Sequence, residues 1–161
     1  EAVAGARVAV DTEWGDAGDA SPAAPPALIQ AAVAGGPVYL VDALALARSE
    51  PAALAAFVAS LLLDGEAPVV GFAFGHDLRR LEPLLPPGGG RRRPVLDLQK
   101  RAGGTRSLRD CCAAWLGRGL DKSEQCSDWE CRPLSPAQVA YAAVDSAVLL
   151  DLHDAMLTVD V

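Results

Sequence analysis

Alternating apolar and polar positions near the start of the chain predict three consecutive strands. Residues 7–14 read RVAVDTEW, a β-branched run that ends in two acids. Residues 27–34 (ALIQAAVA) and 37–42 (PVYLVD) follow, and Gly35-Gly36 between them is typical of a two-residue hairpin turn. We therefore expect an antiparallel meander.

The middle of the chain alternates between helical and strand patterns. Apolar residues at positions 54, 57, 58, 61 and 62 have the spacing of a helix, which we expect from Pro51 to Leu63 across the sheet. Residues 68–74 (PVVGFAF) predict a short buried strand, and residues 78–85 (LRRLEPLL) a short helix. Another short strand is expected at residues 94–98.

A further helix carries capping signals at both ends. Ser107 with Asp110 predicts the start of one helix, which Gly117 ends. The polar segment 118–133 that follows is predicted to be irregular, with Trp129 as its anchor.

The final helix is the most strongly signalled element. Ser135 is a predicted N-cap, Pro136 suits the first helical position, and Gln138 completes a capping box. Tyr141 and Asp145 interrupt the apolar run that follows, and their four-residue spacing places a phenol and a carboxylate on one helix face.

Length and composition favour one globular domain over residues 1–161. The sequence is 51% hydrophobic and only 5% aromatic, so the core should consist of Ala, Val and Leu. No segment approaches the ~18 apolar residues of a membrane span, and no signal peptide is evident. Because the chain starts at Glu1, we expect a domain excised from a larger intracellular protein, cytoplasmic or nuclear.

The net charge argues against nucleic-acid binding by bulk electrostatics. Lys and Arg number 14 against 21 Asp and Glu, a formal charge of −7. A polyanion would need local basic residues or acids masked by divalent cations. Basic residues gather at 79–80, 91–93 and 100–101, and the simpler interpretation of each cluster is solvated surface.

The four cysteines do not predict a metal site. Cys111, Cys112, Cys126 and Cys131 lack paired C-x-x-C spacing. Reduced thiols are the expectation.

Four carboxylates occupy positions where an unpaired charge is costly. They are Asp11 and Glu13 at a strand end, Asp77 at a strand-to-helix junction, and Asp145 on the final helix. An all-oxygen set favours Mg²⁺ or Mn²⁺, and two such ions can drive hydrolysis of a phosphodiester. Taken alone, Asp77 is equally well explained as a helix cap. Tyr141, with an ordinary pKa near 10, would orient the attacking water rather than act as the base.

These residues, in this order, resemble the DEDD exonuclease superfamily. The motifs are D-x-E at Asp11 to Glu13, the central Asp77 in GFAFGHDLRRL, and Y-x-x-x-D at Tyr141 to Asp145, whose tyrosine marks the DEDDy subgroup. The segment 120–150 resembles the matching region of RNase D and the Werner-type exonucleases. GPVYLVDALAL and GHDLRRLEPL look most like the Nibbler-type branch, which is linked to trimming of small RNAs.

The resemblance implies an α/β, RNase H-like fold with a mixed five-stranded sheet flanked by helices. It also implies 3′-to-5′ hydrolysis that releases nucleoside 5′-monophosphates. One metal would lie among Asp11, Glu13 and Asp145, and the second would be served by Asp11 and Asp77.

Substrate-binding residues are predicted at Thr12, Trp14, Phe74 and His76. Trp14 matches a family position near the terminal nucleotide, with core packing as the alternative. For His76 the alternative is a capping or solvent-edge position. The sequence departs from the family at Ala73, where many members carry Asn.

The sequence therefore predicts a metal-dependent exonuclease acting on single-stranded RNA 3′ ends. The alternatives are a Werner-like DNA exonuclease, because no motif reads the 2′-OH, and a degenerate RNA-binding module. The acidic balance leads us to expect flanking domains or a protein partner that supplies substrate affinity.

Overall fold

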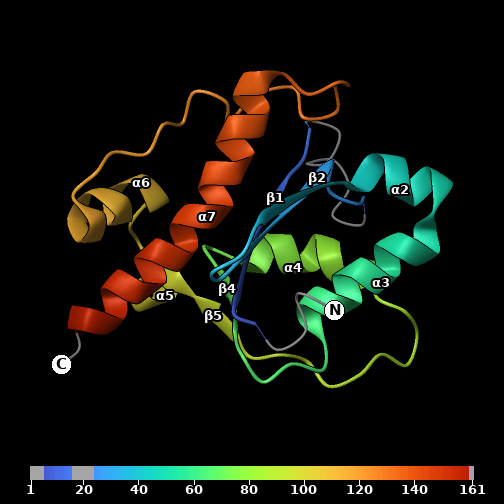
Figure 1. Ribbon diagram of the computed structural model, residues 1–161, viewed down its shortest axis with the longest axis horizontal. Coiled ribbons are helices and arrows are strands. Elements are labelled where there is room, and N and C mark those ends of the chain that lie inside the picture. Colours follow the sequence, from blue (N-terminus) through green and yellow to red (C-terminus); the bar gives the residue numbers. More distant parts are fainter. Residues whose placement is uncertain (1–5, 16–23, 160–161) are drawn as a thin grey trace.

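Five strands form one mixed sheet in the computed structural model, which describes residues 6–15 and 24–159 (Figure 1). They are β1 (Val8–Glu13), β2 (Leu28–Val33), β3 (Val38–Asp42), β4 (Val69–Gly71) and β5 (Val95–Asp97). The order is β3-β2-β1-β4-β5. β1 pairs antiparallel with β2 and parallel with β4, so the predicted meander and mixed sheet are confirmed.

The hairpin between β2 and β3 is longer than the sequence predicts. Ala34 to Pro37 connect the strands, and the Gly36 N–H donates to the Val33 carbonyl over 2.9 Å. Pro37 has no N–H with which to extend the strand pairing. Gly35 has φ +70°, which favours glycine. The predicted two-residue turn is therefore wrong in length but right in place.

The helices are α2 (Ala43–Ser49), α3 (Pro51–Leu62), α4 (Gly75–Leu81), α5 (Leu98–Arg101), α6 (Leu108–Cys111) and α7 (Pro136–Val159), with a 3₁₀ turn η1 (Glu82–Leu84) and a π-helical turn η2 (Cys112–Leu116). The hydrophobic pattern did not predict α2 or α5. Each begins at an aspartate that ends a strand, Asp42 or Asp97, whose carboxylate accepts a hydrogen bond from the first helical turn.

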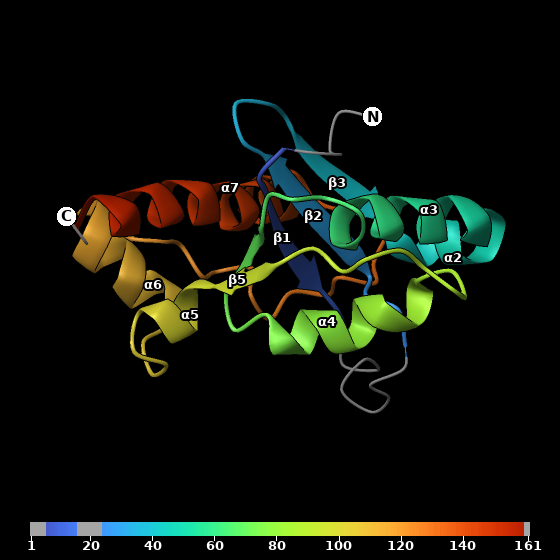
Figure 2. The same ribbon diagram turned by 90° about the horizontal axis from the view of Figure 1, so that it is seen from below.

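Helices cover both faces of the sheet. The core on one face joins Val10 of β1 with Val58 of α3 and Leu81 of α4, and the core on the other joins Ala9 with Leu149 of α7. Figure 2 shows α7 and α4 on opposite sides of β1. The predicted RNase H-like layering is thus present in the chain.

The alternation along β1 decides which helix each later side chain meets. Val8 and Val10 face α3 and α4, whereas Ala9 faces α7. Because successive strand residues point to opposite faces, Asp11 and Glu13 continue on the α7 side and Thr12 on the α4 side.

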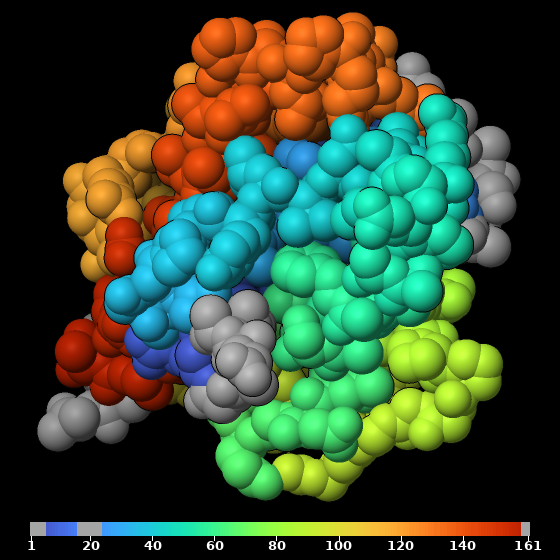
Figure 3. All heavy atoms as spheres, turned by 45° about the vertical axis from the view of Figure 1, so that its right-hand side comes forward, coloured from blue at the N-terminus to red at the C-terminus, as the bar shows by residue number. Residues whose placement is uncertain are grey.

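The start of α7 is held by its cap and by the segment before it. Ser135 and Gln138 form the predicted capping box, with bonds of 2.9 and 3.1 Å. Trp129 is 1% exposed, and its ring lies 5.9 Å from that of Tyr141. Arg132 binds the carboxylate of Asp42 at the end of β3. In Figure 3 the first turns of α7 lie beside the segments from β3 to α3. Trp129 and Arg132 therefore hold the start of α7 to the rest of the fold.

Among the described residues, no helix is long and apolar enough to cross a membrane. All four cysteines are free thiols, as predicted.

Candidate metal centre and active-site cleft

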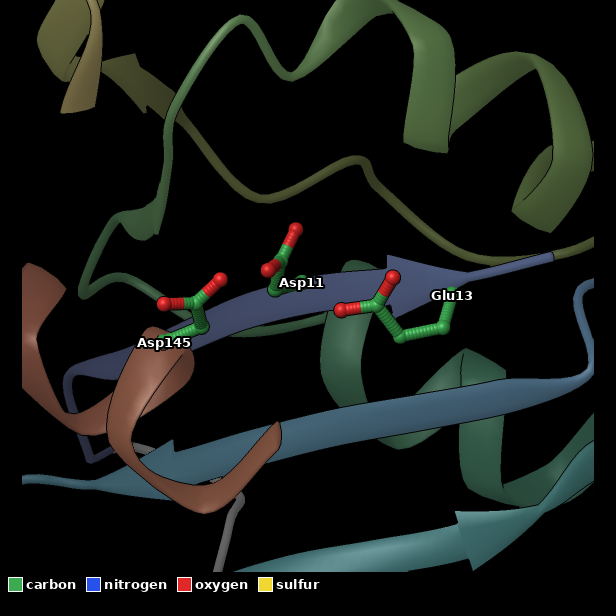
Figure 4. A group of neighbouring side chains, drawn as sticks. All are labelled: Asp11, Glu13 and Asp145. Atoms are coloured by element: carbon green, nitrogen blue, oxygen red, sulfur yellow. The ribbon is translucent and has the colours of Figure 1, made fainter. Parts of the chain in front are cut away.

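Three of the four predicted carboxylates meet at one point. One oxygen each from Asp11, Glu13 and Asp145 lies within 4.8 Å of the others. Figure 4 shows the two β1 side chains and the α7 side chain pointing toward one another. β1 contributes Asp11 and Glu13, and α7 contributes Asp145. Glu13 and Asp145 are 132 positions apart in the sequence, yet their oxygens belong to one cluster.

Asp77 lies beside this cluster rather than in it. It belongs to the first turn of α4, is 4% exposed, and accepts a 2.5 Å hydrogen bond from the Thr12 hydroxyl. Its charge contributes to the raised pKa of Asp11, so the two carboxyls are electrostatic neighbours. The backbone therefore brings Asp77 to the same end of β1 from the opposite face of the sheet.

Burial makes this concentration of negative charge costly. Loss of hydration, followed by the charges of Asp77 and Asp145, raises the pKa of Asp11 well above its usual range. Burial and then the charge of Asp11 raise the pKa of Glu13 to about 9. Burial likewise raises the pKa of Asp77 to about 6, although the Thr12 hydrogen bond opposes the shift. The bare site therefore favours bound protons over a full set of charges.

A lysine from the irregular segment partly offsets this charge. Lys122 Nζ lies 2.8 Å from Asp145 Oδ2 and 3.2 Å from the Tyr141 hydroxyl. Burial and the charge of Asp145 raise the pKa of Tyr141 above its ordinary value. The Tyr141 hydroxyl consequently keeps its proton at working pH and can donate a hydrogen bond.

The chemistry of the donor set fits a hard divalent cation. Asp145 Oδ1 is buried and has no hydrogen-bond partner among the described residues. A buried carboxylate oxygen without a partner is expensive unless a ligand completes it. The three oxygens around it match the ligands that Mg²⁺ and Mn²⁺ prefer.

The cluster opens into a cleft of about 820 Å³. Its walls include Trp14 beyond β1, Arg109 of α6, and Lys122 and Gln125 of the irregular segment. The acids thus lie at the base of a space large enough for a nucleotide, with basic side chains in its walls.

The predicted substrate-binding residues have different surroundings. Trp14 lines the cleft, and Thr12 lines it while its hydroxyl is committed to Asp77. Phe74 is 1% exposed and packs in the core beside α3 and α4. His76 is exposed and hydrogen-bonds to Arg79 over 2.8 Å. Neither Phe74 nor His76 is among the residues that line the cleft, so only the first two have a geometric case for substrate contact.

The basic residues at 91–93 do not reach the cleft walls. Arg93 is 3% exposed and donates to the backbone carbonyls of Ala6 and Ala67. Arg91 pairs with Glu66, and Arg92 lies 3.5 Å from Glu82. This cluster holds the segment before β5 to its neighbours.

Two contacts to the acids were not predicted from the sequence. Lys122 lies in the irregular segment before α7, and no pattern in the sequence indicated that its side chain would reach Asp145. Gln30 is fully buried opposite Asp11, and its amide lies 3.4 Å from Glu13. A polar residue inside the run ALIQAAVA was the available signal.

The chain matches the 3′-5′ exonuclease family over residues 1–159. The human exonuclease mut-7 homolog is 33% identical over 172 residues, which cover 92% of this chain and 20% of that protein. Ribonuclease D of Gluconacetobacter diazotrophicus is 44% identical over 45 residues, 28% of this chain and 12% of that protein. The chain spans less than a quarter of the mut-7 relatives that it matches.

Solved structures agree with this assignment. The Nibbler EXO domain of Aedes aegypti superposes with a TM-score of 0.76 at 26% identity, over 96% of this chain and 79% of that one. Escherichia coli RNase D has the same fold, with a TM-score of 0.73 at 24% identity over 98% of this chain and 40% of that one. The family match and the DEDDy motifs together establish that this chain belongs to the 3′-5′ exonuclease family, as a Nibbler-like member.

Proposed function

We propose that this domain is a metal-dependent exoribonuclease that removes nucleotides from the 3′ end of single-stranded RNA. The observation that carries the proposal is the cluster of Asp11, Glu13 and Asp145 at the base of the cleft, with one oxygen of Asp145 lacking a partner. This arrangement suits Mg²⁺ or Mn²⁺ and a phosphodiester at the cation.

Each side chain then has a separate role. Asp11, Glu13 and Asp145 would hold one divalent ion, and Asp11 with Asp77 would serve the second. Bound ions of this kind supply the Lewis acidity that activates water and stabilises the leaving oxygen. Tyr141 donates a hydrogen bond that orients the attacking water, because its raised pKa keeps the phenol protonated. The products are nucleoside 5′-monophosphates.

Lys122 and Arg109 supply positive charge in a chain whose net charge is −7. Local cations in the cleft walls can hold phosphates even when the whole protein repels a polyanion. Flanking domains or a protein partner would provide the remaining affinity. Trimming of small RNAs is the natural process that we propose.

RNA is favoured over DNA by the similarity to a protein named ribonuclease D, which reaches 44% identity in its matched segment. The test is a pair of 5′-labelled strands of one sequence, as RNA and as DNA, incubated with Mg²⁺, Mn²⁺ or a chelator. We expect a regular ladder that shortens from the 3′ end, faster on RNA, and no products with chelator.

Asp151→Asn is the matched control for acid variants, because Asp151 lies on the same helix, is exposed and pairs with Arg118. Internal cuts, or shortening that persists in chelator, would contradict the proposal. Faster shortening of DNA would support the Werner-like alternative.

A further inference from the structure

The two faces of the end of β1 meet different partners. Thr12, which faces α4, donates its hydroxyl hydrogen to Asp77. Two residues later, Trp14 lies under the guanidinium of Arg80, whose Cζ is 4.4 Å from the ring centroid. Asp77 and Arg80 are three residues apart on α4, a spacing that places them on one helix face. One face of α4 therefore contacts both side chains.

The contact between Arg80 and Trp14 differs from an ordinary surface pairing. Arg80 is only 7% exposed, although arginine is almost never buried without a partner. A guanidinium stacked over an aromatic face is attracted by the ring quadrupole, and the attraction is larger when the cation is shielded from water. The buried position of Arg80 therefore fixes one face of the indole.

Trp14 itself is half-buried and lines the cleft together with Asp11, Glu13 and Asp145. A flat aromatic surface at this place is suited to stacking under a nucleobase. Such stacking tolerates any base, because every base has a π-face. A contact of this kind would let an exonuclease hold whichever base stands at the 3′ terminus.

We propose that Arg80 is a positioning residue, which holds the indole of Trp14 as the stacking surface for the 3′-terminal nucleotide. This inference rests on the proposed function. Arg80 acts through Trp14 and does not touch substrate. Its loss should weaken binding of all four terminal bases alike, with a smaller effect on the rate of hydrolysis.

The test compares KM and kcat of the 161-residue chain on 5′-labelled oligoribonucleotides that differ only in the 3′ base. Stacking is typically worth a factor of roughly ten or more in affinity, so Trp14→Leu and Arg80→Met should each raise KM about tenfold. The double variant should lose no more than Trp14→Leu alone. Arg79→Met is the matched control, because Arg79 is the exposed neighbour on the same helix and should leave KM unchanged.

Arg80→Lys separates stacking from charge. Lysine keeps the positive charge near Asp77 but lacks the planar guanidinium. We expect only partial recovery of KM, and no difference between Lys and Met at position 80 once Trp14 is leucine. The inference would be overturned in favour of an electrostatic role if Arg80→Met changed only kcat and Arg80→Lys restored kcat fully.

Trp14→Leu keeps the inference testable if Arg80→Met does not fold, because Trp14 lies at the cleft and not in the core. If Trp14→Leu remains active and its KM is unchanged, the inference is overturned. Absence of any 3′-end shortening by the unmodified chain would instead overturn the proposed function.

Discussion

The two sides of β1 handle polar side chains in opposite ways. On the α7 side, Asp11 and Glu13 face Asp145, and the only cation among their described polar contacts is Lys122. On the α4 side, Asp77 accepts from the Thr12 hydroxyl and Arg80 covers Trp14. The first side is left with excess negative charge, whereas on the second side Asp77 has a hydrogen-bond donor and Arg80 has an aromatic partner.

This difference indicates where the chain depends on a ligand. A buried cluster of like charges is stable only when it binds protons or cations, since desolvation and repulsion act together. On the α4 side a single carboxylate has a hydrogen-bond donor, and burial raises its pKa only to about 6, so it depends less on a cation than the cluster does. We therefore expect bound metal to affect the α7 side strongly and the α4 side, which contributes Asp77 alone to the proposed second ion, less.

The largest expected effect comes from removing a ligand on the α7 side. Asp145→Asn should reduce 3′-end shortening at least about 1,000-fold, because metal-ion stabilisation of the reaction is worth several kcal/mol and each 1.36 kcal/mol is a factor of ten. The measurement is a single-turnover rate with Mn²⁺, alongside circular dichroism to establish the fold. Asp151→Asn should retain full activity. Substantial activity in Asp145→Asn would rule out the carboxylate as a metal ligand.

Lys122→Met tests whether lysine compensates the acids. Asp145 is 3% exposed, and the Lys122 side chain is only 24% exposed. Removing one member of such a pair leaves a buried charge, so the metal-free protein should lose about 2–3 kcal/mol in free energy of unfolding. Urea unfolding with chelator gives this value.

Lys100→Met is the control for this variant, because its side chain is 83% exposed. Saturating Mn²⁺ should recover part of the stability lost in Lys122→Met, since the ion supplies the missing positive charge. Equal loss in both lysine variants would show that Lys122 carries no special role.

The pH dependence of metal-free stability has a definite sign. The pKa of Glu13 is raised from 4.5 to about 9, so the folded state keeps a proton that the unfolded state releases between these values. The unfolded state then binds fewer protons than the folded state, so the free energy of unfolding falls as pH rises through this range. Melting temperatures in chelator should decrease from pH 5.5 to pH 8.5.

Two controls sharpen this expectation. Glu13→Gln removes one titrating group and should reduce the pH dependence, with the remainder coming from Asp11 and Asp77, whose pKa values are also raised. Saturating Mn²⁺ should do the same, because cation binding requires the deprotonated carboxylate. A melting temperature that rises with pH in chelator would contradict the assigned direction.

The sequence predicted the strands, the α7 cap and the acids of the α7 side because these depend on local pattern. Alternation in β1 and four-residue spacing in α7 are visible in the letters alone. Lys122, Gln30 and Arg80 were not predicted as contacts because each pairing is set by tertiary packing between distant segments. Phe74 was predicted to bind substrate, whereas the β4-to-α4 turn places its side chain in the core.

The smallest expected effect lies in that same turn, on the α4 side. Ala73 has φ +51°, a left-handed conformation that costs a residue with a Cβ about 1–2 kcal/mol. The cost is retained because the Ala73 N–H donates to Asp97 Oδ1 over 3.0 Å, and the turn sets the start of α4 and therefore the place of Asp77. Ala73→Gly keeps this backbone bond and relieves the strain, although glycine has more entropy to lose on folding. We expect a gain of about 0.5–1 kcal/mol in free energy of unfolding, measured in urea with and without Mn²⁺.

Ala56→Gly, at an exposed position inside α3, should lose about 1 kcal/mol in free energy of unfolding and shows what the same exchange does in a helix. Because the strain is local to the turn and Asp77 is the one proposed ligand on the α4 side, the gain at position 73 should be nearly equal in both conditions, and a gain that depends strongly on Mn²⁺ would mean that the two sides of β1 are coupled.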